Sequence, residues 1–228
     1  MNKRILKNGF RLIFIACLSL GLSACAGGLP KYWPEKTSRV YDVSTNQPIQ
    51  DVLVVATWHG TGGLEGARND CYHLESARTN EKGEFTISEY SEGFSDALKT
   101  QKYIHLSFYK LNYKLNENLI SNSYIQNDNY YLEKFTGSPK ERFAYITGRG
   151  RGPSCSSGGD SKRKSFDFHK AVYEEAKSLA KTIKEKEDVQ WLKERMASQI
   201  DTSYRKFTGD EKERKVDKII KEYELRGK

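Results

Sequence analysis

The apolar run VLVVATW occupies residues Val52–Trp58 and contains three β-branched valines. A run of this kind is typical of a strand that is buried on both faces. Shorter candidate strands lie on both sides of it, at Ser38–Val43, Tyr72–Arg78, Glu84–Ser88, Tyr103–Tyr109 and Phe143–Ile146. Many short strands joined by turns, with no helical pattern between them, favour an antiparallel β-sandwich. We therefore expect a mainly β fold over residues 36–147.

The turns of this region carry a resemblance to a known family. Asp42, Thr45-Asn46 and Pro48-Ile49 precede the strand Val52–Val55, and Thr79–Phe85 reads TNEKGEF. This order resembles the carboxypeptidase regulatory-like domain, which has a transthyretin-like, immunoglobulin-like β-sandwich. The matching motifs encode turns, so the resemblance implies a fold and no chemistry.

Three positions depart from that family, which often has glycine where this chain has Asn46, Asp51 and Asn112. Asparagine and aspartate are the residues other than glycine that best tolerate a left-handed backbone. We therefore expect the turns to survive these changes.

The first 24 residues have the pattern of an export signal. Lys3, Arg4, Lys7 and Arg11 precede an apolar segment at Leu12–Leu22, which is too short to span a bilayer. The segment ends in Leu22-Ser23-Ala24-Cys25, which resembles the lipobox of bacterial lipoproteins. The resemblance implies cleavage before Cys25 and attachment of lipid, such as diacylglycerol and palmitate, at that residue. An ordinary secretory signal with a chance cysteine is the alternative.

By the same resemblance, Ala26 rather than aspartate after the cysteine indicates the outer membrane of a Gram-negative bacterium, with the protein facing the periplasm. Cleavage also changes the charge, because the leader holds four basic residues and no acidic ones, so the net charge of +8 falls to +4. We therefore expect the protein to attach to the membrane through Cys25, and we expect no nucleic acid among its partners.

Two cysteines remain after Cys17 is removed with the leader and Cys25 is lipidated, namely Cys71 and Cys155. Disulfides persist in exported proteins, so two spare thiols favour a Cys71–Cys155 bridge. Two free thiols are the alternative.

Beyond the sandwich the pattern changes twice. Residues 148–165 are rich in glycine, serine and basic side chains, which indicates an exposed, flexible loop held by Cys155. From Phe166 onward, apolar residues recur at helical spacing, as at Val172, Ala176 and Leu179. We expect a helical extension that either packs on the sandwich or docks an envelope protein. The first helix is expected to pack on the sandwich, and both alternatives stay open for the last helix.

The expected organisation has five segments: a lipoprotein signal peptide at 1–24, a tether at 25–35, the sandwich at 36–147, the basic loop at 148–165 and the helical extension at 166–228.

Sequence motifs for catalysis or metal binding are absent. The histidines, His59, His73, His105 and His169, lack metal-ligand spacing, and there is no nucleophile elbow or phosphate-binding loop. We therefore expect no catalytic residue, metal or cofactor, and a protein that is a binding or envelope-assembly module rather than an enzyme. The alternative is a glycan- or peptide-binding module, because ten aromatic residues fall between Tyr103 and Tyr145. Those rings fill the core in the competing interpretation.

Overall fold

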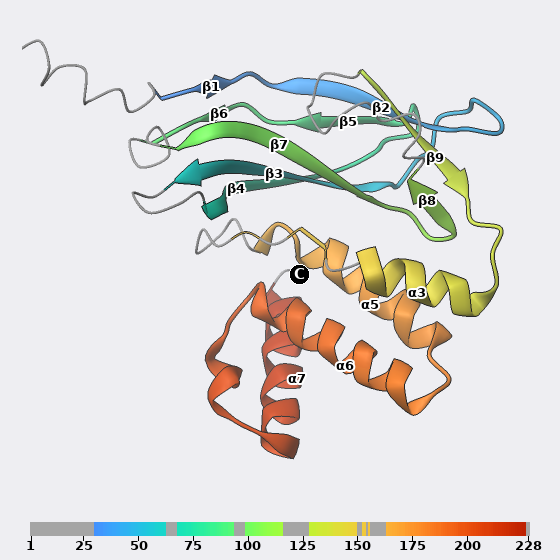
Figure 1. Ribbon diagram of the computed structural model, residues 1–228, viewed down its shortest axis with the longest axis vertical. Helices are drawn as coiled ribbons and strands as arrows, with labels where there is room; N and C mark the ends of the chain where they lie inside the picture. Colours follow the sequence, from blue (N-terminus) through green and yellow to red (C-terminus); the bar gives the residue numbers. More distant parts are fainter. Residues whose placement is uncertain are drawn as a thin grey trace, which may run out of the picture.

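The computed structural model describes residues 30–62, 68–93, 99–115, 128–149, 152–153, 155 and 163–226. Within these residues, three small sheets come first along the chain and four α-helices follow (Figure 1). The expected order, a β region followed by a helical extension, is confirmed, although the chain as a whole is not mainly β. The fold is mixed α/β, and the sheets do not form one clear sandwich.

The strands form one four-stranded, one three-stranded and one two-stranded sheet. The four-stranded sheet has the order β5 (Glu84–Ile87), β2 (Lys36–Asp42), β9 (Asn129–Lys134) and β8 (Tyr113–Leu115). The three-stranded sheet has the order β4 (Arg68–Arg78), β3 (Leu53–Gly62) and β7 (Thr100–Tyr109). Strands β1 (Tyr32–Trp33) and β6 (Tyr90–Ser91) pair separately. Pairing is antiparallel except between β2 and β9.

The central strand β3 is buried on both faces, as its apolar run predicted. Val54, Ala56 and Trp58 belong to a core shared with the four-stranded sheet. Val55 points the other way, into a core formed with the helices. Successive side chains of a strand point to opposite faces. A strand between two cores is therefore apolar at consecutive positions.

The expected left-handed turns are confirmed. The φ angles are 52° at Asn46, 59° at Asp51 and 61° at Asn112. Gly83 has φ of 71°, and a Cβ atom there would lie 2.6 Å from the carbonyl oxygen of Val40. The turn at Gly83 therefore requires glycine, while the other three positions accommodate side chains that tolerate this conformation.

The expected strand at Phe143–Ile146 was wrong, because these residues lie in helix α3 (Pro139–Arg149). Ser138 and Glu141 bond reciprocally: the Ser138 amide donates to Glu141 Oε2 at 2.7 Å, and the Glu141 amide donates to Ser138 Oγ at 3.3 Å. This capping box, with proline at the first helical position, begins a helix. Phe143 and Ile146 are three residues apart, so they lie on one helical face, where both are buried.

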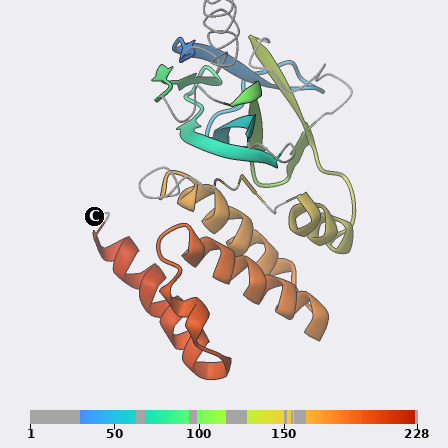
Figure 2. The same ribbon diagram turned by 60° about the vertical axis from the view of Figure 1, so that its left-hand side comes forward.

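The remaining helices stack outward from the three-stranded sheet. Helix α5 (Phe166–Leu179) packs on β3 and β7, α6 (Ile183–Ser198) packs on α5, and α7 (Gly209–Arg226) packs on α6 (Figures 1 and 2). The expected packing of the first helix is confirmed. The last helix packs as well, because Val216 is fully buried in a small cluster with Ala197 and Tyr204. Of the helices in the described ranges, none is long and apolar enough to cross a membrane.

Part of the segment 25–35, where a tether was expected, forms a strand. Tyr32 and Trp33 pair with Ser91 and Tyr90 as strand β1, and this strand lies on the side of the sheets opposite the helices (Figure 1). Strand β1 is the first element in the part of the chain that the structure describes.

Candidate functional site

The expected disulfide is present between Cys71 of β4 and Cys155. Both residues are buried, and the bond ties the three-stranded sheet to the segment that precedes α5. Cys25, the expected site of lipid attachment, and the whole leader lie outside the described residues.

The segment 148–165 was expected to be exposed, and its described part is not a free loop. Pro153 and Cys155 are buried. The ring of His169 on α5 bonds through Nε2 to the carbonyl oxygen of Pro153 at 3.1 Å, and Arg195 of α6 donates to the carbonyl oxygen of Gly152 at 3.0 Å. Burial, with a smaller contribution from Arg195, lowers the pKa of His169 to about 4, against the hydrogen bond to Pro153. The ring is therefore neutral near neutral pH.

The other histidines lie in the three-stranded sheet. His73 stacks on Tyr90 with ring centroids 3.7 Å apart, and His59 stacks on Tyr103 at 5.1 Å. Burial lowers the pKa values of His59 and His105. Among the residues that the structure describes, no group of three or more His, Cys, Asp or Glu side chains is placed to hold a metal ion.

The aromatic residues between Tyr103 and Tyr145 do not form an exposed platform in the described part of the chain. Each of these rings that the structure describes is buried or half-buried. Phe108 and Tyr130, for example, pack together with ring centroids 4.9 Å apart. Tyr124 lies outside the described residues.

A buried carboxylate attaches β1 to the sheets. Glu92 accepts hydrogen bonds from Trp33 Nε1 at 3.0 Å and from the hydroxyl of Tyr72 at 2.9 Å, and it also pairs with Lys102. Burial raises the pKa of Glu92, but these partners together with the amide of Lys31 outweigh it and hold the pKa below its usual value. The carboxylate is therefore charged and fully engaged in holding the N-terminal strand.

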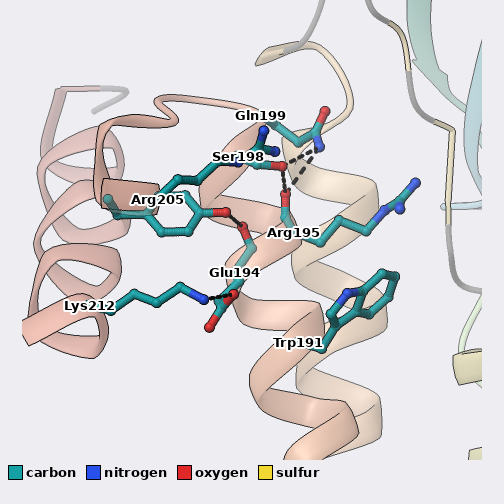
Figure 3. Close-up of a pocket in the computed structure, with 8 residues that line it drawn as sticks. Trp191, Glu194, Arg195, Ser198, Gln199, Arg205 and Lys212 are labelled. Carbon is teal, nitrogen blue, oxygen red and sulfur yellow. Dashed lines mark hydrogen bonds and ion pairs between the residues drawn. The ribbon is translucent and has the colours of Figure 1, made fainter. Parts of the chain in front are cut away.

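The helical layer contains a pocket of about 340 Å³ between α6, the 3₁₀ helix η2 (Ser203–Lys206) and α7, which we call the α6–α7 pocket (Figure 3). Its lining residues are Trp191, Glu194, Arg195, Ser198, Gln199, Tyr204, Arg205 and Lys212.

The helical period of α6 explains how one helix supplies four of these residues. Trp191, Glu194, Arg195 and Ser198 are spaced by three and four residues, so they lie on neighbouring turns of the helix. The chain then turns at Asp201, whose carboxylate accepts the amide of Ser203 at 2.8 Å. This turn brings η2 and the first turns of α7 against α6.

Several lining groups are held by one another. Lys212 Nζ lies 2.6 Å from Glu194 Oε2, and the hydroxyl of Tyr204 donates to the carbonyl oxygen of Glu194 at 2.8 Å. The guanidinium of Arg195 lies over the ring of Trp191, with Cζ 5.4 Å from the ring centroid. Figure 3 shows Trp191 and Arg195 on one side of α6, while Glu194 and Lys212 meet on the other.

The residues that line the α6–α7 pocket carry a net positive charge, because Arg195, Arg205 and Lys212 are cationic and Glu194 is the one anionic residue among them. Within the described residues the guanidinium of Arg205 forms no hydrogen bond or ion pair, and Arg205 is exposed. Trp191 is 44% exposed, although large apolar side chains of α6 such as Leu192 and Met196 are buried. The pocket therefore offers a cationic group and an uncovered aromatic ring.

The sequence patterns did not identify this site. The helical spacing draws attention to Val189, Leu192 and Met196, which pack on α5. Trp191 lies off that apolar stripe on the polar side of the helix. A large aromatic residue at such a position is the one signal for the site that the sequence contains.

Comparisons with known proteins identify no family. No family model matches the sequence, and no curated protein matches it. The crystal structure of a 9R-lipoxygenase from Cyanothece PCC8801 is similar over 64% of this chain, at 10% identity and a TM-score of 0.27. The matched region spans 24% of the lipoxygenase chain. A similarity this weak supports no transfer of fold or function.

Proposed function

We propose that this protein is an outer-membrane lipoprotein that faces the periplasm and acts as a non-catalytic binding or envelope-assembly module. In this account lipidated Cys25 anchors the chain, a transthyretin-like β-sandwich forms the body, and the helical layer carries the binding surface. The shared core of the four-stranded and three-stranded sheets and the left-handed Asn46, Asp51 and Asn112 support the assignment of the body.

The observation that carries the proposal is that strand β1 and the helices α6 and α7 lie on opposite sides of the sheets. Strand β1, the first described element, lies on one side of the sheets, and α6 and α7 lie beyond the other side (Figures 1 and 2). A chain anchored shortly before β1 therefore presents the α6–α7 pocket away from its anchor. Both attachments are firm, because the Glu92 hydrogen bonds hold β1 and the Cys71–Cys155 bond holds the segment before α5.

Metabolic labelling with an alkyne analogue of palmitate tests the anchor. The native chain is expected to take up label and to sediment with outer membranes, and a Cys25→Ala variant is expected to lose both properties. Cys71→Ala is the matched control, since it removes a different thiol and leaves the lipobox intact. Equal labelling of the native chain and Cys25→Ala would overturn the proposal.

A peptide-binding module is the second candidate, and the α6–α7 pocket favours it. The pocket combines an exposed aromatic ring with three cationic side chains, and peptides offer matching apolar and acidic groups. A glycan-binding role has weaker support, since none of the described rings between Tyr103 and Tyr145 is fully exposed. A peptidoglycan pull-down that retains the native chain, but not Trp191→Ala, would favour the glycan instead.

A further inference from the structure

We propose that the α6–α7 pocket recognises an acidic peptide segment, with a ligand carboxylate bound by Arg205 and an apolar side chain of the same segment covering Trp191. The inference rests on the proposed role as a binding module and names the chemistry of its ligand. The charge of the pocket and the exposure of Trp191 do not depend on the lipid anchor, so the binding test and the labelling test can fail separately.

The charge of the pocket selects an anion. Arg205 has no partner in the described part of the chain, and its guanidinium presents a planar set of donors that fits a carboxylate. Figure 3 shows its side chain reaching from η2 toward the end of α6. Glu194 is already paired with Lys212 at 2.6 Å, so it leaves Arg205 uncompensated.

The exposed ring of Trp191 favours a ligand that carries an apolar side chain as well as the carboxylate. Trp191 is 44% exposed, and Arg195 lies over its ring while donating to the carbonyl oxygen of Gly152. The ring is therefore positioned by contacts that do not cover it completely. Covering exposed aromatic surface is favourable, and tryptophan and arginine are common anchors of binding sites.

The size and place of the pocket favour a peptide over a membrane. A volume of about 340 Å³ accommodates a short segment rather than a folded surface. The helices that line the pocket, α6 and α7, also lie on the far side of the sheets from β1 (Figure 1). A second pocket, lined partly by Arg163, Asp201, Glu222 and Arg226, contains equal numbers of cationic and anionic side chains, so it has no comparable preference.

Fluorescence anisotropy with the full chain in detergent tests the proposal. The probe is a labelled octapeptide that alternates glutamate and leucine, and its counterpart alternates glutamine and leucine. The glutamate peptide is expected to bind more tightly. Arg205→Gln is expected to weaken its binding about tenfold, the effect of losing a hydrogen-bonded charge pair. Trp191→Ala is expected to weaken binding of the same peptide.

Two variants are matched controls. Arg214→Gln removes the same charge from an exposed position of α7 outside the pocket, and Leu225→Ala removes an exposed apolar side chain of the same helix. Both are expected to change the affinity by less than about twofold.

Several outcomes would overturn the proposal. Equal losses in Arg205→Gln and Arg214→Gln would show that only general surface charge attracts the peptide. Equal binding of the two peptides would show that no carboxylate is recognised. Absence of binding by both would remove the site, and preferential binding of phosphatidylglycerol vesicles, sensitive to Arg205→Gln, would identify a lipid site instead.

Discussion

Arg142 of α3 forms a two-point ion pair with Glu175 of α5, with Nε 2.8 Å from Oε1 and Nη2 2.9 Å from Oε2. Both side chains are buried, at 5% and 4% exposure. The hydroxyl of Tyr109 in β7 also donates to Glu175 Oε2 at 2.9 Å, and Arg142 Nη1 donates to the carbonyl oxygen of Tyr113 at 2.5 Å. Burial together with the Glu175 charge raises the pKa of Tyr109. One cluster therefore joins two helices to the sheets.

Removing either partner of this pair is expected to destabilise the protein strongly. Arg142→Gln or Glu175→Gln leaves a buried charge without its counter-ion, which costs about 3–5 kcal/mol of unfolding free energy. Urea denaturation measures the loss. The double variant Arg142→Met with Glu175→Leu removes both charges and is expected to be more stable than either single variant.

A surface ion pair provides the control. Lys184 lies 3.5 Å from Asp188 on α6, and its side chain is 77% exposed. Lys184→Gln is expected to change the unfolding free energy by less than about 1 kcal/mol. Similar losses in Lys184→Gln and Arg142→Gln would contradict the structural role of the buried pair.

The Cys71–Cys155 bond is expected to stabilise the fold substantially. It joins positions separated by 84 residues, and closing a loop of this length in the unfolded chain is worth about 4 kcal/mol. Thermal unfolding of the native chain is therefore expected to shift to lower temperature on addition of reductant. A variant with alanine at both positions is expected to be insensitive to reductant, and a native chain that is equally insensitive would count against the bond.

The left-handed turn between β7 and β8 predicts an unusual order of substitutions at Asn112. The backbone there has φ of 61°, which alanine adopts at a cost of about 1 kcal/mol relative to asparagine or glycine. Asn112→Gly is expected to retain the native unfolding midpoint in urea, and Asn112→Ala is expected to lower it. The reverse order would show that the asparagine side chain itself is required.

Stability is expected to fall as the pH drops below neutrality, partly because of His169. Its pKa is about 4 in the folded protein and 6.5 as an ordinary value, so below pH 6.5 the unfolded chain binds a proton that the folded chain excludes. The resulting loss is about 2 kcal/mol between pH 7 and pH 5. It is complete only near pH 4, where the folded protein also takes up the proton.

His169→Gln provides the comparison, because glutamine retains a donor for the carbonyl oxygen of Pro153. Urea unfolding at several pH values is expected to give a shallower slope for this variant. His59 and His105 add slope in the same direction, since their pKa values are also lowered. Parallel slopes for the native chain and His169→Gln would contradict the neutral buried state.

Local patterns predicted the strands and turns whose signals lie within a few residues. The apolar run of β3 and the left-handed asparagines belong to this group. Burial on both faces requires apolar residues, and a left-handed backbone favours asparagine, so residue type alone indicates each feature. Helix α3 was missed, although Ser138, Pro139 and Glu141 form a recognisable helix start. The apolar spacing of Phe143 and Ile146 fits a helix, while the short stretch alone resembles a strand.

Long-range pairing was not predictable in this way. Strand β9 pairs in parallel with β2, so Val40 lies opposite Tyr130, and nothing in either strand specifies that partner. The α6–α7 pocket depends similarly on a turn that folds α7 back onto α6. The sequence shows the residues of α6 that lie off its apolar stripe, Trp191, Glu194 and Arg195 among them, but it does not show that Arg205 and Lys212 come to lie beside this helix.

Site-specific photo-crosslinking in intact cells tests the central claim most directly. The aromatic photoreactive residue benzoylphenylalanine keeps a ring at position 191 and is expected to capture an acidic envelope protein there. Arg205→Gln in the same chain is expected to abolish capture, while Arg214→Gln preserves it. Photoreactive groups at position 225 serve as the exposed control on α7. Capture that is equal from positions 191 and 225, or unaffected by Arg205→Gln, would contradict a binding module that acts through the α6–α7 pocket.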